Sequence, residues 1–428
     1  MSKQKKPRPP VPAWLSLDNA AKIYPAARTK GWMPLFRVSV TLTEEIDQAL
    51  MQKALEQALV RVPIFGYRLR RGLFWYYLEE QKTLPRVEGD ARNPMLPFNL
   101  TGGKRFMFRL RCHKRRVALE VFHALTDGYG AATFLLTLTA EYLHLKHGLR
   151  IPPQAMILDT REAPRREERE DVFPRVARDV TRSRREEIAW QLRGTREMHR
   201  YLRVVTGVML TDRLLAVARE KKTTVNTLLA AVLLQALLKQ KAASRRGRNK
   251  PVKLSLPVNL RKYYGADTLR NFSFYVNVPV HTGLGAEKLE DLITYVTHFM
   301  GLETMEQQLN ARFSANVKAE QNKFLRVAPL FLKSLVLKVM YRATGERYIT
   351  STLTNLGNMK LPEEMARYVL RMDLVLGAAQ KTPISAAVIS AGGRTCFTFS
   401  KTMKQSGVER AFFTALVQLG VPVLIESN

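Results

Sequence analysis

The stretch RFMFRLRCHKRRVALEVFHALTDGYGAATFLLTLTAEYLHLKHG, residues 105–148, sets the fold class of this chain. Its first part has the alternating apolar residues of two β-strands that meet near residues 113–115. Residues 130–147 have the pattern of a long apolar helix, and Gly148 follows as a C-cap. The segment HALTDG joins the two parts, so we expect His123 where a buried strand ends and Asp127 just before a helix begins.

Strand and helix patterns alternate on both sides of this stretch. Strands are predicted over residues 35–43, 253–261, 268–280 and 349–358, hairpins over 68–80 and 381–402, and helices within 44–62, 211–240, 289–300, 324–341 and 406–420. Thr43 is the expected N-cap of the first of these helices. Alternation of this kind in both parts of the chain predicts an α/β or α+β architecture with two similar halves.

The length of 428 residues is too great for one ordinary core and suggests two packed units. Residues 161–203 are dense in mixed charge and poor in apolar side chains, which is typical of a solvent-exposed linker. We therefore predict a first half over residues 1–160 that carries HALTDG, a charged linker over 161–203, and a second half over 204–428.

Cysteine and hydropathy patterns favour a cytoplasmic protein. Cys112 and Cys396 form neither a disulfide framework nor a metal-binding CxxC pair, which fits a reducing compartment. The basic N-terminus lacks the apolar core of a secretory signal. Residues 228–238 are the most apolar stretch and are well short of the ~20 residues that cross a bilayer. Residues 327–342 combine lysines with a broad apolar face, which fits either an ordinary packed helix or peripheral contact with a membrane.

The formal net charge of +32 favours anionic partners. These include acidic lipid, an acidic carrier protein and a phosphorylated co-substrate. No recognised nucleic-acid-binding motif accompanies the charge, so nucleic acid is not an expected partner.

Several familiar active sites are absent from the sequence. It contains no G-x-S-x-G elbow, no P-loop and no H-E-x-x-H zinc helix. Gly128-Tyr129-Gly130 resembles the start of a dinucleotide loop, but Thr133 occupies the place of the third glycine. His144 and His147 share a helix face without an accompanying acid or cysteine ligand, so we predict no metal site.

The HALTDG segment places a histidine beside a carboxylate at a strand-to-helix turn. A neutral imidazole with an ordinary pKa near 6.5 can accept a proton from a hydroxyl or amine at neutral pH. The alternative is structural: the His123 ring is hydrogen-bonded in the core and Asp127 is only an N-cap. The six residues by themselves leave both interpretations open.

More of the chain resembles the superfamily of condensation domains and chloramphenicol-acetyltransferase-like enzymes, whose signature is H-x-x-x-D-G. The similar segments, in family order, are ALEQALVRVPIFGYRLRRGLFWYYLEE, HALTDG, TVNTLLAAVLLQAL, PVNLR, NFSFYVNVPV and LTNLGNMKLP. The resemblance implies an α/β fold of two chloramphenicol-acetyltransferase-like halves with a tunnel at their interface. It is strongest to the branch of alcohol acetyltransferases and wax-ester synthase-like enzymes.

The resemblance also implies roles for individual residues. His123 would be the general base, Asp127 a structural acid paired with Arg261, and Gly128 the residue that permits the turn. Thr354, Asn355 and Gly357 would lie near the channel and could stabilise an oxyanion. Two positions depart from the family pattern: Phe122 replaces the first of two histidines found in condensation domains, and Thr354 replaces a serine.

The expected function is that of an acyltransferase, which moves an acyl group from acyl-CoA to a small alcohol or amine. Acyl-CoA would be a co-substrate, and no bound cofactor is expected. One alternative is a condensation or offloading enzyme that uses an acidic acyl carrier protein. Another is a non-catalytic binding protein on the same fold, with peripheral membrane contact.

Overall fold

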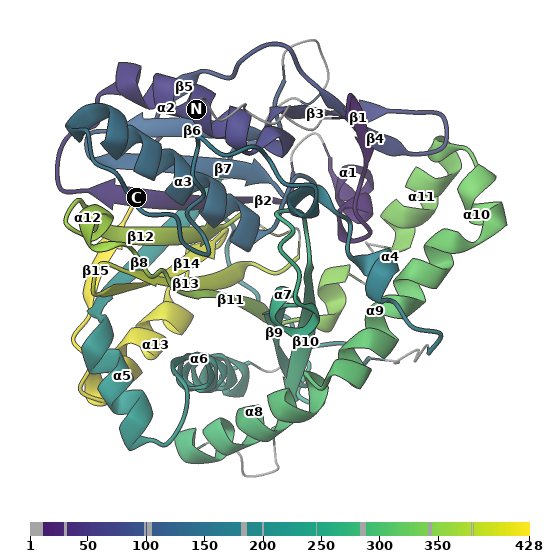
Figure 1. The fold of residues 1–428 in the computed structure, drawn as a ribbon. Coiled ribbons are helices and arrows are strands. Elements are labelled where there is room, and N and C mark those ends of the chain that lie inside the picture. Colours follow the sequence, from purple (N-terminus) through teal and green to yellow (C-terminus); the bar gives the residue numbers. More distant parts are fainter. Residues whose placement is uncertain are drawn as a thin grey trace, which may run out of the picture.

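The computed structural model describes residues 12–29, 32–97, 100, 105–180, 186–198, 201–244, 246–282, 288–340, 345–377, 379 and 381–428. Two mixed sheets with helices packed on them make up most of these residues (Figure 1). The predicted α/β class is confirmed, and most predicted strands and helices are present within a few residues of their expected ends.

The first sheet holds the strand that leads to His123. Its order is β12 (Val369–Leu376), β2 (Leu35–Leu42), β7 (Arg116–Phe122), β6 (Phe108–His113) and β5 (Val87–Gly89). Neighbouring strands are antiparallel, except that β5 runs parallel to β6. Helices α2 (Gln48–Arg61) and α3 (Gly128–His147) pack on each other, and α3 packs on β2 and β7. The end of β7 is thereby held between β2 and α3.

Side-chain caps fix where these two helices begin. Asp47 caps α2 by accepting hydrogen bonds from the amides of Ala49 and Leu50, at 2.8 and 3.0 Å. The prediction that Thr43 is the cap is therefore wrong, because the helix begins four residues later than the charge pattern indicated. Helix α3 begins at Gly128, two residues earlier than predicted, with Asp127 as its N-cap; the predicted C-cap is confirmed, since Gly148 lies in the left-handed region with φ of 68°.

The second sheet has seven strands in the order β10 (Ser273–Val280), β9 (Val252–Asn259), β11 (Ser351–Asn358), β13 (Ile384–Ala391), β14 (Arg394–Lys401), β8 (Arg203–Leu210) and β15 (Leu424–Ser427). Only β11 runs parallel to its neighbours. Helix α6 (Val225–Ala242) is buried on nearly every side, as its uniformly apolar sequence requires. It packs between α8 (Leu289–Glu303), α13 (Gly407–Gln418) and α5 (Thr211–Glu220).

Strand β12 belongs to the second half by sequence but pairs with β2 in the first sheet, with Leu374 opposite Val38. One strand from the predicted second half therefore belongs to the first sheet. The predicted division of the chain at residues 160 and 204 stays a prediction. The segment between those residues is less exposed than its charge suggested, since Phe173, Trp190 and Leu202 are buried against the two sheets' cores.

A third, three-stranded sheet and a group of helices lie beside the two main sheets (Figure 1). The sheet order is β1 (Trp14–Ser16), β4 (Tyr76–Glu80) and β3 (Tyr67–Arg71), and the helices are α1 (Ile23–Ala27), α9 (Glu306–Gln321), α10 (Lys323–Val327) and α11 (Leu330–Met340). The single helix predicted over 324–341 is thus two helices, because Pro329 has no backbone N–H to continue the first. Residue 341 lies outside the described residues.

The remaining short elements are η1 (Ala20–Lys22), η2 (Pro63–Gly66), η3 (Glu167–Arg169), α4 (Phe173–Val176), α7 (Arg261–Tyr264), η6 (Glu346–Tyr348) and α12 (Glu363–Ala366). Among the residues that the structure describes, no helix has both the length and the apolar character needed to cross a bilayer.

Candidate active site

His123 directly follows β7, and its ring lies between two aromatic side chains. The Tyr24 ring of α1 stacks on it with centroids 4.7 Å apart, and the Phe36 ring of β2 lies 5.0 Å away. The backbone amide of His123 donates to the carbonyl of Pro34 at 3.0 Å. The residue as a whole is partly buried. The ring is therefore held firmly at the end of β7.

A short hydrogen-bonded chain fixes the orientation of the imidazole. Its Nδ1 lies 3.0 Å from Oδ1 of Asn271, and Nδ2 of Asn271 donates to the Asp18 carboxylate at 3.2 Å. A carboxylate accepts hydrogen bonds, so the Asn271 amide must turn its nitrogen toward Asp18 and its oxygen toward the histidine. Nδ1 of His123 then carries the proton, and Nε2 is left with its lone pair.

The surroundings of His123 also favour its neutral form. Burial lowers its pKa from the ordinary value, and the charge of Asp127 opposes this effect only in part. Asp18 is fully buried, and burial raises its pKa despite a nearby Arg270. A neutral imidazole with an unprotonated Nε2 is the state that a general base requires at neutral pH.

Asp127 and Arg261 form the buried pair that the resemblance implied. The two guanidinium nitrogens lie 2.7 and 3.1 Å from the two carboxylate oxygens, in bidentate geometry. The same carboxylate accepts hydrogen bonds from the amides of Gly130 and Phe272, at 3.1 and 3.0 Å. These contacts hold the HALTDG turn in place. The ion pair between Asp127 and Arg261 joins the turn to the segment after β9.

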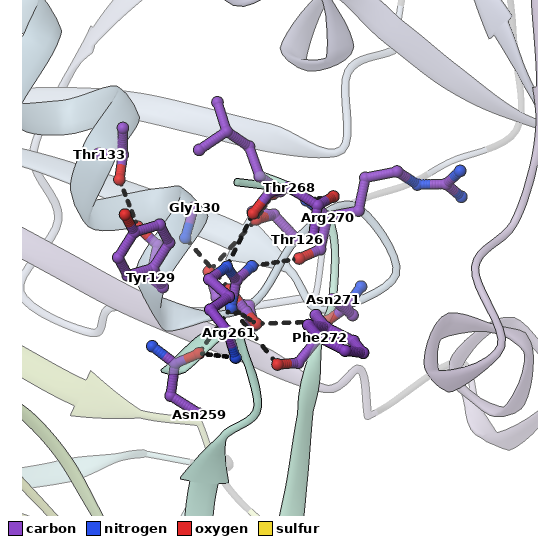
Figure 2. A network of polar contacts seen from close by, with 12 residues as sticks. Thr126, Tyr129, Gly130, Thr133, Asn259, Arg261, Thr268, Arg270, Asn271 and Phe272 are labelled. Carbon is purple, nitrogen blue, oxygen red and sulfur yellow. Dashed lines mark hydrogen bonds and ion pairs between the residues drawn. The ribbon is translucent and has the colours of Figure 1, made fainter. Parts of the chain in front are cut away.

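Figure 2 shows Arg261 at the centre of this network. Its guanidinium also donates to the carbonyls of Thr268 and Arg270, at 2.7 and 2.5 Å. The Tyr129 ring lies 4.5 Å from its central carbon. Arg261 begins α7 rather than ending a strand as predicted, and its side chain holds the loop that carries Asn271. The ion pair therefore positions both His123 and the residue that orients it.

Two glycines let the turn approach its neighbours closely. A Cβ on Gly128 would lie 2.7 Å from a methyl group of Leu356 in β11, which is a flexible side chain. A Cβ on Gly130 would lie 2.1 Å from Oγ1 of Thr126 and 2.2 Å from the backbone oxygen of Leu269. The backbone oxygen cannot move easily, so Gly130 has the stricter requirement although the motif points to Gly128.

The predicted oxyanion residues Thr354, Asn355 and Gly357 lie in β11, next to the Leu356 side chain that contacts Gly128. Nδ2 of Asn355 donates to Oδ1 of Asn226 at 3.1 Å, and its Oδ1 accepts from the Gly357 amide at 2.7 Å. Gly357 has a φ of 81°, which favours glycine. These contacts bend β11 around Gly357. That Thr354, Asn355 or Gly357 stabilises an oxyanion stays a prediction.

Sequence reasoning did not identify Asn271, Asp18 or Tyr24, which all contact His123 or its partner. Asn271 stood in the quoted segment NFSFYVNVPV, but nothing in one sequence distinguished it from other strand residues. Asp18 and Tyr24 lie about 100 residues before His123 in the chain. Their proximity depends on how α1 packs, which no local pattern predicts.

Other reactive groups are less suited to catalysis. Burial raises the pKa of the Cys112 thiol to about 12 and also raises that of Cys396, so neither is a ready thiolate. No cluster of three or more potential metal ligands occurs in the described part of the chain. An open cavity of about 650 Å³ between α2 and residues 84–87 shares no residue with the His123 site. The tunnel implied by the resemblance stays a prediction.

No protein-family model and no curated protein matches the sequence of this chain. Solved structures do. The first condensation domain of the calcium-dependent antibiotic synthetase, in complex with a substrate analogue, matches with a TM-score of 0.62 at 15% identity over 96% of this chain and 99% of its own. The starter condensation domain of rhizomide synthetase, a mutant in complex with C8-CoA and Leu-SNAC, matches with 0.61 at 13% identity over 95% of each chain.

A third similar structure is polyketide synthase associated protein 5 from Mycobacterium tuberculosis, with a TM-score of 0.59 at 13% identity over 95% of this chain and 97% of its own. Identities this low show the fold alone. The chain therefore has the two-halved α/β fold of condensation domains along nearly its whole length.

Proposed function

We propose that this protein, built on the condensation-domain fold, is an acyltransferase in which His123 is the general base. The observation that carries the proposal is the contact between Nδ1 of His123 and Oδ1 of Asn271, backed by Asp18. It leaves Nε2 with its lone pair, which is the state that a general base requires.

The reaction follows from this geometry. Nε2 of His123 removes the proton from an acceptor hydroxyl or amine as its oxygen or nitrogen attacks the carbonyl carbon of a thioester. The tetrahedral intermediate collapses, the carbon–sulfur bond breaks, and the imidazolium returns the proton to the thiolate. The products are an ester or amide and a free thiol, and the base ends in its starting state.

Asp127, Arg261 and Gly128 support the base without touching the substrate in this mechanism. They hold the turn and the Asn271 loop, because a base displaced by one ångström loses much of its effect. Thr354 and Asn355 are the proposed donors to the intermediate's oxyanion, with Gly357 shaping the strand that carries them.

Acyl-CoA is the proposed donor, as a co-substrate rather than a bound cofactor, and a small alcohol or amine is the proposed acceptor. The net charge of +32 would attract the phosphates of CoA. Phe122 occupies the position of the first of the two histidines in condensation domains, and it is fully buried in the first core. That histidine therefore has no counterpart in this chain. This favours the alcohol acetyltransferase and wax-ester synthase-like branch.

A carrier-protein-dependent condensation or offloading enzyme is the second candidate, favoured by the condensation domains among the similar structures. An acidic acyl carrier protein would suit the basic surface, and its docking would weaken as salt rises. The direct comparison is between one acyl group on CoA and the same acyl group on a carrier protein.

The test is free-thiol release from a panel of acyl-CoAs with alcohol and amine acceptors. His123→Ala should lower kcat/KM by about 10²–10⁴-fold, the usual contribution of a general base. His144→Ala is the matched control, since His144 is an exposed residue of α3 whose Nδ1 contacts the nearby carbonyl oxygen of Leu149. Wild-type turnover by the His123 variant would refute the mechanism, and activity with neither donor would favour a non-catalytic binding protein.

A further inference from the structure

Helix α11 exposes its apolar face to solvent, whereas an ordinary surface helix buries that face. Phe331, Leu335 and Val339 follow each other at intervals of four residues and are 61, 61 and 58% exposed. Leu332 and Val336 lie beside them on the same stripe and are also exposed. The lysine at position 333 is only 9% exposed, although a surface helix usually turns its lysines outward.

The contacts of Lys333 hold α11 in this orientation. Its Nζ donates to the backbone oxygens of Phe74 and Arg326, at 2.9 and 3.0 Å, and lies 4.8 Å from the centroid of the Trp75 ring. Burial lowers its pKa below the ordinary value. Rotating the apolar stripe inward would break both hydrogen bonds, so the outward stripe is part of the folded structure.

The turn between β3 and β4 extends the apolar surface. Leu73 is 72% exposed and Phe74 is 47% exposed. The amide of Leu330 donates to the carbonyl of Leu73 at 2.9 Å, so the turn lies against the start of α11 (Figure 1). We call the set the α11 patch, and its exposed residues are Leu73, Phe74, Val327, Phe331, Leu332, Leu335, Val336 and Val339. Exposed large apolar side chains gathered on one helix and its neighbouring turn are typical of an interaction site.

The charged side chains around the α11 patch are mostly basic, and the acidic residues next to it in the chain are Glu79 and Glu80 of β4 and Glu320 of α9. Residues 67–78 and 323–340 contain only basic ionisable side chains apart from tyrosines, namely Arg68, Arg70, Arg71, Lys323, Arg326, Lys333 and Lys338. Arg68 and Arg70 pair with Glu79, while Arg71, Lys323, Arg326 and Lys338 are exposed. A twofold dimer through this surface would place these positive charges against their own copies. An anionic surface complements them.

We propose that the α11 patch docks on an anionic membrane surface, with the apolar side chains in the headgroup boundary and the basic residues near lipid phosphates. Helix α11 packs on α1, whose Tyr24 stacks on His123, so α1 lies between the docking helix and the candidate active site. Docking does not depend on catalysis, and His123→Ala should bind vesicles as the wild type does.

The experiment is co-sedimentation of the full chain with vesicles of equal parts phosphatidylcholine and phosphatidylglycerol, and with phosphatidylcholine alone. The patch variant is Leu335→Glu/Val339→Glu. Its matched control, Leu302→Glu/Val417→Glu, places the same two substitutions on exposed residues of α8 and α13. Both pairs lower the net charge equally, and because all four side chains are exposed, folding should be preserved, as circular dichroism would verify.

We expect the wild type to bind the anionic vesicles at ~0.05 M salt and to lose at least about tenfold in partition constant at ~1 M salt. The patch variant should bind at least about tenfold more weakly than the control variant. Wild type that stays in the supernatant at low salt would overturn the proposal. So would a patch variant that binds as the control does, or a solution dimer that only the patch variant dissociates.

Discussion

Replacing Asp127 with alanine tests whether the ion pair holds the turn and the Asn271 loop together. The change leaves the Arg261 guanidinium buried without its carboxylate and removes the acceptor of two backbone amides. Removing one partner of a buried pair costs about 3–5 kcal/mol, because an uncompensated charge remains. We expect the free energy of unfolding to fall by that amount.

Asp47→Ala is the matched control. Asp47 also caps a helix through two backbone amides, but both of its hydrogen bonds are exposed and it has no buried ionic partner. Loss of an exposed cap costs about 1 kcal/mol.

Urea unfolding, followed by tryptophan fluorescence and circular dichroism, measures the difference between the variants. A destabilisation by Asp127→Ala no larger than that by Asp47→Ala would refute the reasoning.

The other predictions concern the base, its support and the charges around it. Because burial lowers the pKa of His123, kcat/KM should rise with pH through an apparent pKa below 6.5 and then level off, and a rise centred above 7 would contradict this. Asn271→Leu should lower kcat about 10–100-fold with little change in KM and alter the imidazole tautomer in nitrogen-15 NMR spectra; an unchanged tautomer would remove Asn271 as its determinant. Gly130→Ala should destabilise the fold by about 1–3 kcal/mol or more in thermal unfolding, whereas Gly66→Ala, which has open space around its Cβ, should not. Burial raises the pKa of Asp171 from 3.8 to about 6, so its ionisation destabilises the folded state as pH rises through that range; Asp171→Asn should therefore stabilise the protein by up to about 3 kcal/mol near pH 8 and not near pH 4, as paired urea titrations would show.

Local sequence determined the elements and the chemistry of the turn. The alternating residues of β6 and β7, the uniformly apolar α6, and the Asp127 and Gly148 caps of α3 all follow from neighbouring residues, whose preferences act over one or two turns of chain. The same reasoning misplaced the start of α2 and missed the break at Pro329, where a single capping or proline contact shifts a boundary by a few residues.

Tertiary structure decided which distant residues meet. The Asn271–Asp18 chain, the stacking of Tyr24 on His123, and the pairing of β12 with β2 join segments separated by about 100 residues or more. These contacts form when the two cores are buried, and the local preferences of the residues do not predict them. The orientation of α11 is decided in the same way: its pattern fitted either a packed helix or peripheral membrane contact, and the Lys333 contacts with Phe74, Arg326 and Trp75 turn its apolar face out. The sequence by itself thus determined a histidine at a strand end. The packing around it decided which nitrogen is ready to accept a proton.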